Sequence, residues 1–486
     1  MATKTRDEHD MLSPVKFSRL PKRGLLLGLN GPQLACLALA VIALVAALYV
    51  GGTTVFAIST IIWLPAVILG LAFVQGRKLV DWTPIVVSWI IRTKQGHAMT
   101  TRNPMKPQPA DHLAIPGDTS LRCYQDPASG ACMIYDPNQQ TLTATIQVTH
   151  PSFILLDPAD QERRVQTWGR VLASCCRSGR IARIQILERT LPDSGSGLAE
   201  WWQRHGYDDG SWTARVYQNL IHQAGPTSEK HSTTISLALD MKTAHKTIRA
   251  AGGGTKGAAA VLNQEMTTLT TALRSADLNP GTWLTPSQIA VILRTTYDPN
   301  ASTTLDRHPQ IGRHLPDATP LALQETWDHL RSDTAFHAVL WISEWPRAQV
   351  FPGFLAPIML STGIRRSFTL ICTPLRADVA AKDIRRKKTE HIADQAQRAK
   401  IGQIEDASQT AEYHDVLQQE ADLASGHGIM RYTGLIAISA PTENELQAGV
   451  AAVEQAALQA SCETRLLVGQ QATAFSIAAL PLCRAV

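Results

Sequence analysis

The sequence lacks the short motifs that mark common classes of enzymes and metal sites. It contains no GxSxG or HExxH, and none of its eight cysteines forms a CxxC pair. The nearest approach to a phosphate-binding loop is residues 252–257, but Gly257 is followed by alanine where a P-loop needs the GK[ST] ending. We expect this segment to be a loop before a helix. The absences predict a protein that is not an enzyme and that holds no metal or cofactor.

The cysteines and histidines are too irregularly spaced for a zinc site or a disulfide framework. The cysteines are Cys36, Cys123, Cys132, Cys175, Cys176, Cys372, Cys462 and Cys483. We expect them to be reduced core residues, in agreement with a cytoplasmic location. A lone histidine in a predicted strand, such as His337, is expected to be a core residue with satisfied hydrogen bonds.

Charge is absent from residues 24–76, which contain no Asp, Glu, Lys or Arg. One helix of that length would be far longer than a bilayer is thick, whereas two helices of about 30 Å match the hydrocarbon core. We predict helices over 32–50 and 55–74, joined by a turn at Gly51 and Gly52. A cleaved signal peptide followed by an anchor is the alternative, but the second apolar stretch follows the first without a translocated segment.

Basic residues flank this charge-free block on both sides. They are Lys16, Arg19, Lys22 and Arg23 before it, and Arg77, Lys78, Arg92 and Lys94 after it. The positive-inside rule therefore predicts a multi-pass protein of the bacterial inner membrane with both termini in the cytoplasm. The overall net charge of +5 is small and argues against direct nucleic-acid binding.

The segment after the block has the pattern of a helix lying in the membrane interface. Trp82 and Trp89 are seven residues apart and share one helical face with Val86. The membrane-interface residues that we expect are Arg77, Lys78, Trp82, Trp89 and Arg92. The alternative is an ordinary helix of the cytoplasmic domain.

The rest of the chain alternates between strand and helix patterns and predicts an α+β domain with split βαβ units. The clearest alternation is in the last third, with strands over 336–343, 368–372 and 433–439 and a helix over 443–460. The segments that we expect are a basic tail 1–31, the transmembrane hairpin 32–75, an interfacial helix 76–102, a linker 103–112, a subdomain 113–330 and a second subdomain 331–486.

Residues 377–426 are polar and rich in helix formers, which predicts a projecting helical arm. The simplest interpretation of the charges on such an arm is a solvated face, and a partner-docking arm is the alternative. The candidate docking residues are Trp345, Arg347, Arg365, Arg366, Arg385, Arg386, Lys387 and Lys388.

Several segments resemble components of conjugation machines. Residues 25–92 resemble the two-helix inner-membrane subunits of type IV secretion and conjugation systems, including the PrgI family. The strand 141–148, the segment 342–347 and the run 469–475 resemble the N-terminal, non-motor region of the conjugation ATPases that partner those subunits. The layout as a whole is similar to an actinobacterial family of conjugation-associated membrane proteins.

The resemblance implies a scaffold that docks a separate P-loop ATPase at the membrane, within an oligomer or multi-subunit complex. In the conjugation ATPases a nucleotide-binding core follows such a region, whereas this chain stops at Val486. The accessory membrane subunit of type VII secretion is the first alternative. A membrane-anchored enzyme with an unrecognised site is the second.

Overall fold

The computed structural model divides the chain into two units, one of Ser18–Ala98 and one of Met1–Phe17 with Met99–Val486. The structure describes residues 17, 29–51, 53–74, 77–103, 105, 109–150, 153–224, 229–308, 310–401, 407–425 and 428–485. The basic residues predicted in the N-terminal tail lie outside the described residues, as does much of the predicted linker.

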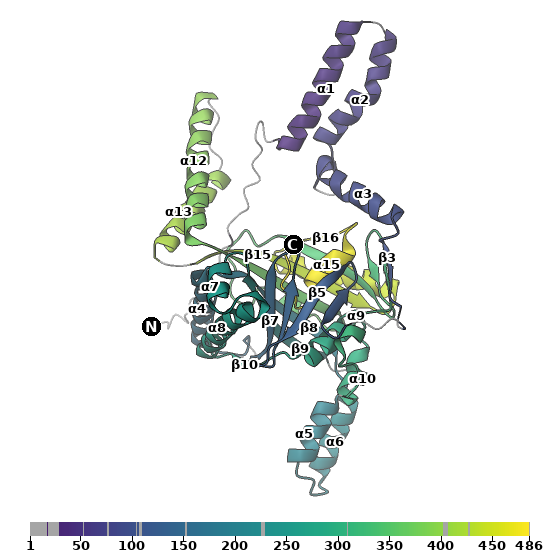
Figure 1. The fold of residues 1–486 in the computed structure, drawn as a ribbon, viewed down its shortest axis with the longest axis vertical. Coiled ribbons are helices and arrows are strands. Elements are labelled where there is room, and N and C mark those ends of the chain that lie inside the picture. The colour runs from purple at the N-terminus through teal and green to yellow at the C-terminus, as the bar shows by residue number, and fades with distance from the viewer. Residues whose placement is uncertain are drawn as a thin grey trace, which may run out of the picture. The chain divides into compact units, whose positions relative to one another are not determined.

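The smaller unit contains two apolar helices that pack against each other. Helices α1 (Gly31–Val50) and α2 (Thr53–Leu71) meet where the start of α1 lies beside the end of α2 (Figure 1). Gln33 Nε2 donates to the Gly70 carbonyl at 2.7 Å, and a Cβ on Gly70 would lie 3.1 Å from Leu37 Cγ. The absence of a side chain at Gly70 therefore lets the two helices approach closely.

The two helices differ as candidates for crossing a membrane. Residues Gly31–Tyr49 of α1 are long and apolar enough to span a bilayer, whereas the apolar part described in α2, Phe56–Leu71, is shorter. The second crossing therefore remains a prediction. A two-stranded hairpin, β1 (Phe73–Val74) with β2 (Arg77–Lys78), leads to helix α3 (Leu79–Lys94).

The larger unit is organised around one antiparallel sheet of 14 strands. Its strands are β3 (Met99–Thr101), β4 (His112–Ile115), β5 (Asp118–Gln125), β6 (Cys132–Asp136), β7 (Thr141–Thr149), β8 (Ile181–Pro192), β9 (Glu229–Asp240), β10 (Asn279–Trp283), β11 (Ala322–Glu325), β12 (Leu330–Arg331), β13 (Phe336–Glu344), β14 (Arg365–Leu375), β15 (Ile429–Ala440) and β16 (Glu463–Leu466). The predicted subdomain boundary at 330/331 falls inside β12.

Two βαββαβ halves form the centre of this sheet. The first half is β7–α4–β8–β9–α8–β10, and the second is β13–α11–β14–β15–α14–β16. In each half the first strand pairs with the third and the fourth, and the second strand pairs with the third. The halves join where β8 pairs with β14. The split βαβ prediction is confirmed, and it applies to both halves.

The helices of the two halves have different lengths. The crossover helices are α4 (Pro158–Ser178), α8 (Gly254–Ser275), α11 (Ala356–Met359) and α14 (Glu443–Gln459). The remaining helices of the larger unit are α5 (Ser196–His205), α6 (Trp212–Ala224), α7 (His245–Ala250), α9 (Pro286–Tyr297), α10 (Ala301–Arg307), α12 (Ala377–Ile401), α13 (Ala407–Ala424) and α15 (Gln471–Ala478). A 3-10 turn covers Leu315–Asp317.

Each half carries a pair of helices inserted between its second and third strands. Helices α5 and α6 lie between β8 and β9, and helices α12 and α13 lie between β14 and β15. Because β8 and β14 run antiparallel, the two pairs leave opposite ends of the sheet (Figure 1). The helical arm predicted over 377–426 is present as α12 and α13.

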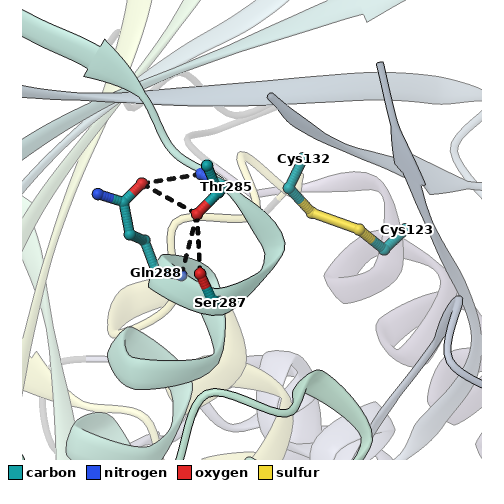
Figure 2. Close-up of a disulfide and its surroundings, with 5 residues drawn as sticks. All are labelled: Cys123, Cys132, Thr285, Ser287 and Gln288. Carbon is teal, nitrogen blue, oxygen red and sulfur yellow. Dashed lines mark hydrogen bonds between the residues drawn. A yellow bond between two sulfur atoms is a disulfide. The ribbon is translucent and has the colours of Figure 1, made fainter. Parts of the chain in front are cut away.

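Two cysteines form a disulfide, which contradicts the expectation that all eight are reduced. Cys123 on β5 and Cys132 on β6 lie on neighbouring strands with their Cα atoms 6.1 Å apart (Figure 2). The spacing of nine residues brings them together because the β5–β6 hairpin places both on one face of the sheet. The remaining cysteines are free thiols, and burial raises the pKa of Cys175 to about 11 and of Cys483 to about 12.

His337 conforms to expectation, whereas the glycine-rich segment does so only in part, because α8 already begins at Gly254. His337 is fully buried in β13, and its two ring nitrogens lie 2.9 Å from Ser332 Oγ and 2.8 Å from Ser439 Oγ. Residues 252 and 253 form a turn before α8. Gly257 lies inside that helix, where a Cβ would come within 2.5 Å of the Ile248 carbonyl.

Candidate partner-binding site

The C-terminal segment lies inside the larger unit and joins its two halves. Four adjacent strands, β14, β8, β9 and β7, each direct one polar side chain at backbone carbonyls of residues 477–481. The donors are Thr369, Gln185, Ser236 and Thr145. Buried backbone carbonyls require such partners, so this row of polar residues is structural.

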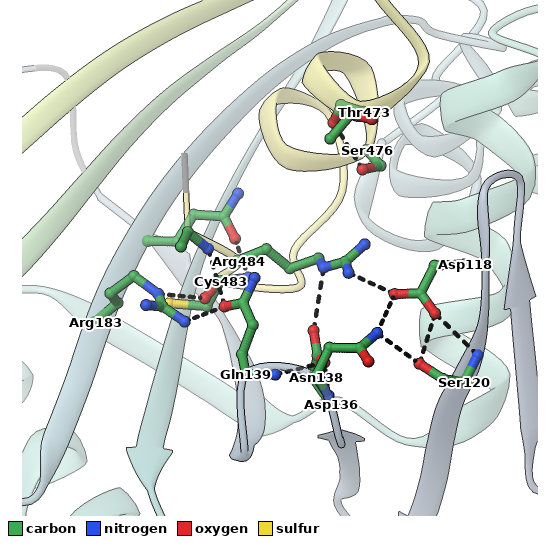
Figure 3. Close-up of polar contacts among 12 residues, drawn as sticks. Asp118, Ser120, Asp136, Asn138, Gln139, Arg183, Thr473, Ser476, Cys483 and Arg484 are labelled. Atoms are coloured by element: carbon green, nitrogen blue, oxygen red, sulfur yellow. Dashed lines mark hydrogen bonds and ion pairs between the residues drawn. The ribbon is translucent and has the colours of Figure 1, made fainter. Parts of the chain in front are cut away.

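Arg484 fastens the end of this segment to the first half of the sheet. Its guanidinium bridges Asp118 and Asp136, and Arg183 Nε donates to the Cys483 carbonyl at 3.0 Å (Figure 3). Burial alone would raise the pKa of Asp118, but hydrogen bonds from Ser120 and the charge of Arg484 outweigh it and lower that pKa. The C-terminal segment over 477–484 is therefore an interior element, not an exposed surface.

Trp345, one of the predicted docking residues, already has a partner within the chain. The ring of Phe17 stacks on Trp345 with centroids 5.3 Å apart, and it lies 5.4 Å from Phe354 and 5.8 Å from Tyr432. Gly434 makes room for Trp345, since a Cβ there would meet Trp345 Cζ2 at 2.9 Å. Phe17 thus covers part of Trp345, the side chain that the sequence suggested for a partner.

The three predicted docking arginines near Trp345 have different environments. Arg347 is exposed and pairs with Glu344 and Glu463. Arg365 is half-buried on β14 opposite Ser439. Arg366 is only 3% exposed, because its side chain points into the interior and donates to three backbone carbonyls, those of residues 359, 361 and 364. Arg366 therefore lacks the exposed position that a docking residue needs.

Three of the four docking residues predicted on the α12/α13 arm are engaged with acids of the same arm. Arg386 and Lys387 pair with Asp383, and Lys388 Nζ lies 2.7 Å from Glu420 Oε2 on the neighbouring helix. Arg385 is exposed on α12. These pairs support the solvated-face interpretation of the charge run.

The α5/α6 arm instead exposes large apolar side chains. The exposed fractions are 50% for Trp201, 73% for Trp212, 83% for Tyr207 and 57% for Leu220. We call this set of four residues the aromatic arm surface. Sequence reasoning missed it, although Trp212, Val216 and Leu220 recur at every fourth position and mark one helical face.

The predicted membrane-interface residues lie on β2 and α3 of the smaller unit. Lys78 Nζ donates to Gln33 Oε1 at 2.5 Å, and Trp82 Nε1 donates to the Val74 carbonyl at 3.3 Å. The Arg92 guanidinium lies 5.8 Å from the centre of the Trp89 ring. The remaining residue, Arg77, is half-buried on β2.

Helix α3 has no buried residue within this structure. Its exposed apolar side chains are Val86, Val87, Ile90 and Ile91. They present an apolar surface alongside the tryptophans and Arg92, which is the composition of a helix at a membrane interface. The interfacial position itself remains a prediction.

The residues that the structure describes include no group of three or more His, Cys, Asp or Glu side chains arranged to hold a metal ion. His337, the most deeply buried histidine, has a pKa lowered to about 3 by burial and is fully engaged by serines. It contributes to packing against Phe475 at a ring distance of 4.3 Å.

Comparison with known families connects this architecture with protein secretion. A family model described as a putative type VII ESX secretion system translocon, EccE, matches residues 227–342, which extend from the start of β9 into β13. No curated protein matches the chain. The family match, together with the apolar helix α1, supports a membrane protein of a secretion system, and it does not support the specific resemblance to conjugation and type IV components.

Proposed function

We propose that this protein is a non-catalytic accessory membrane subunit of a type VII-like secretion machine. The observation that carries the proposal is the match of residues 227–342 to the EccE family model. The matched segment includes strands from both βαββαβ halves, so it belongs to the centre of the larger unit. The conjugation scaffold with a type IV apparatus stays a prediction without support from this comparison.

The smaller unit supplies the membrane attachment in this proposal. Helices α1 and α2 cross the inner membrane as a hairpin, α3 lies at the cytoplasmic interface, and both termini are cytoplasmic. The apolar length of α1 and the close packing around Gly70 support the hairpin. A reporter inserted after Gly51 should be active only in the periplasm, whereas a C-terminal reporter should be active only in the cytoplasm. The reverse pattern would overturn this topology.

The aromatic arm surface supplies the contact with a neighbouring subunit. Tryptophan and tyrosine are enriched in the centres of protein interfaces, where they bury a large area at low cost in side-chain entropy. The partner in our proposal is another subunit of the same machine that presents an apolar surface to Trp201, Trp212 and Leu220. A separate P-loop ATPase is the subunit that we expect to find in the complex.

The test is a pull-down of the full chain from membranes solubilised in mild detergent, followed by mass spectrometry. The variant combines W201S, W212S and L220S, and the matched control combines R385Q and R386Q on the other arm. We expect the wild type and the control to recover type VII secretion subunits, and the aromatic variant to recover at least tenfold less, since interface anchors contribute about 2 kcal/mol each.

Two results would overturn the proposal. Recovery of type IV conjugation subunits in place of type VII subunits would return the assignment to the conjugation scaffold. If the control variant lost the secretion subunits and the aromatic variant still recovered them, the docking surface would lie on α12/α13 instead. The melting temperature of both variants should match the wild type, because all substituted residues are exposed.

A further inference from the structure

Arg189 is a buried cation without a carboxylate partner in the described part of the chain. It lies on β8, its residue is 3% exposed, and its Nη2 donates to Thr295 Oγ1 on α9 at 2.8 Å. Its Nε is buried and has no hydrogen-bond acceptor among the described residues. Burial lowers the pKa of Arg189 to about 10, so the guanidinium is still charged at neutral pH. A buried charge in this state costs folding free energy.

A cavity of about 210 Å³ lies beside this guanidinium. Three cationic side chains line it, Arg189, Lys230 and Arg313, against one carboxylate, that of Asp306, whose Oδ1 lies 3.6 Å from Lys230 Nζ. Ser287 and Gln288, in the first turn of α9, also line the cavity (Figure 2 shows both residues). The first turn of a helix carries a partial positive charge, which adds to the attraction for an anion.

Arg366 shows how the same fold treats a buried arginine that is purely structural. It is equally buried at 3%, but it donates to three backbone carbonyls in the turn between α11 and β14. Arg189 donates to one side-chain hydroxyl among the described residues, that of Thr295, and it faces a cavity. The difference points to a partner for Arg189 other than the residues that the structure describes.

We propose that this cavity binds a phosphate-type oxyanion, either free phosphate or a small phosphate monoester, with Arg189 as its principal partner. A planar guanidinium pairs with two oxygens of such a group. Asp306 Oδ2 is buried without a hydrogen-bond partner among the described residues, and a singly protonated phosphate carries an O–H that can donate to it. One water takes up roughly 30 Å³, so the cavity holds an ion of phosphate size and not a nucleotide.

The proposal is independent of the proposed function and is tested on the full chain purified in mild detergent. Thermal unfolding is followed while sodium phosphate replaces sodium chloride at constant ionic strength, with sodium acetate as a second probe. We expect a saturable rise of the melting temperature with phosphate and a weaker rise with acetate, which lacks the O–H group. Direct binding is measured by phosphorus NMR line broadening with inorganic phosphate.

Arg189→Met distinguishes an anion-binding role from a packing role, because the two roles predict opposite changes in the melting temperature. The variant should melt at a higher temperature than the wild type without phosphate, since it removes an unpaired buried charge, and should lose the phosphate response. Arg366→Met should melt at a lower temperature and keep the response. Arg313→Gln, at an exposed position, should fold normally and bind phosphate roughly tenfold more weakly.

Three outcomes would overturn the proposal. The first is a melting temperature that does not respond to phosphate in the wild type. The second is an equal response in R189M, which would assign the rise to a general effect of the salt on protein surfaces. The third is unchanged phosphate affinity in R313Q together with destabilisation in R189M, which would make Arg189 a packing residue.

Discussion

The two βαββαβ halves share one connectivity, yet they differ in almost everything outside the sheet. The first crossover helix has 21 residues in the first half, α4, and 4 residues in the second, α11. The inserted arm exposes aromatic side chains in the first half and carries ion-paired charges in the second. The strands define the shared core, whereas helices and arms are free to diverge. Differences in function are therefore to be sought in the arms.

The largest expected effect tests whether the two halves unfold independently of each other. Gln185 on β8 holds the C-terminal segment through the carbonyls of Ile477 and Leu480 and the amide of Cys483. Gln185→Met should lower the free energy of unfolding by about 3 kcal/mol, because three buried polar groups lose their partners. Urea unfolding of the full chain measures this loss.

The control for this variant is Gln166→Met on the exposed face of α4, which should change the free energy of unfolding by less than about 0.5 kcal/mol. One shifted transition would show that the larger unit unfolds as a whole. Two transitions, of which only one shifts, would contradict the joining role of the C-terminal segment.

The second prediction concerns the pH dependence of stability that His337 gives to the second half. Burial lowers the pKa of His337 to about 3, so the folded state holds a neutral ring where the unfolded chain, with an ordinary pKa of 6.5, takes up a proton. This contribution to stability is complete above pH 6.5 and is lost as the pH falls from 6.5 towards 3, at about 1.4 kcal/mol per pH unit. The first half has no histidine in its corresponding strand, β7.

Urea unfolding at pH 6.5 and pH 5.0 tests this prediction above the range where most carboxylates titrate. The wild type should lose about 2 kcal/mol between these two values. His337→Asn, which keeps a polar side chain between the two serines, should show a flatter dependence on pH. An equal slope in both proteins would assign the acid sensitivity to other groups.

A third, smaller effect is expected where Phe17 packs on aromatic rings of the second half. Phe17→Ala should lower the free energy of unfolding by about 1 kcal/mol, because it removes a stacked aromatic pair with Trp345. A double-mutant cycle with Trp345→Ala isolates the coupling between the two rings. Additive effects of the two substitutions would show that the two rings do not stabilise each other.

The smallest expected effect concerns the ion pair within the α12/α13 arm, which has no counterpart in our predictions for α5/α6. Lys388→Gln removes the ion pair to Glu420 that connects α12 with α13. We expect an unchanged unfolding midpoint and faster amide exchange in α13, measured by hydrogen–deuterium exchange. Arg385→Gln, on the exposed face of α12, should change neither quantity. Loss of midpoint stability in either variant would give the charged arm a larger structural role.

The sequence predicted much of the fold because hydrophobic periodicity is local. The strand over 336–343, the helix over 443–460 and the arm over 377–426 are present as β13, α14 and the pair α12/α13. The repeated connectivity of the two halves was not predicted, because strand pairing is not local in the sequence and the short α11 conceals its correspondence to α4.

The candidate sites were less accessible from sequence because they depend on contacts between distant residues. In the sequence Arg366 follows Arg365 and such a basic pair suggests exposure. In the structure its guanidinium donates to backbone carbonyls of the turn before β14. Cys123 meets Cys132 only through the register of a hairpin. Arg189 follows Glu188 in the chain, and only the packing of α9 over β8 shows that it has no carboxylate partner in the described residues.

The smaller unit is an insertion whose two ends are both fixed to the larger one, and this has a mechanical consequence. Residue 17 is held by aromatic rings, and residue 99 begins β3, which pairs with β11 and is followed by Arg102 bound to Asp317 at 2.6 Å. A pull on helices α1 and α2 is therefore divided between an aromatic contact and a ladder of hydrogen bonds. We expect the aromatic contact to give way before the sheet loses β3.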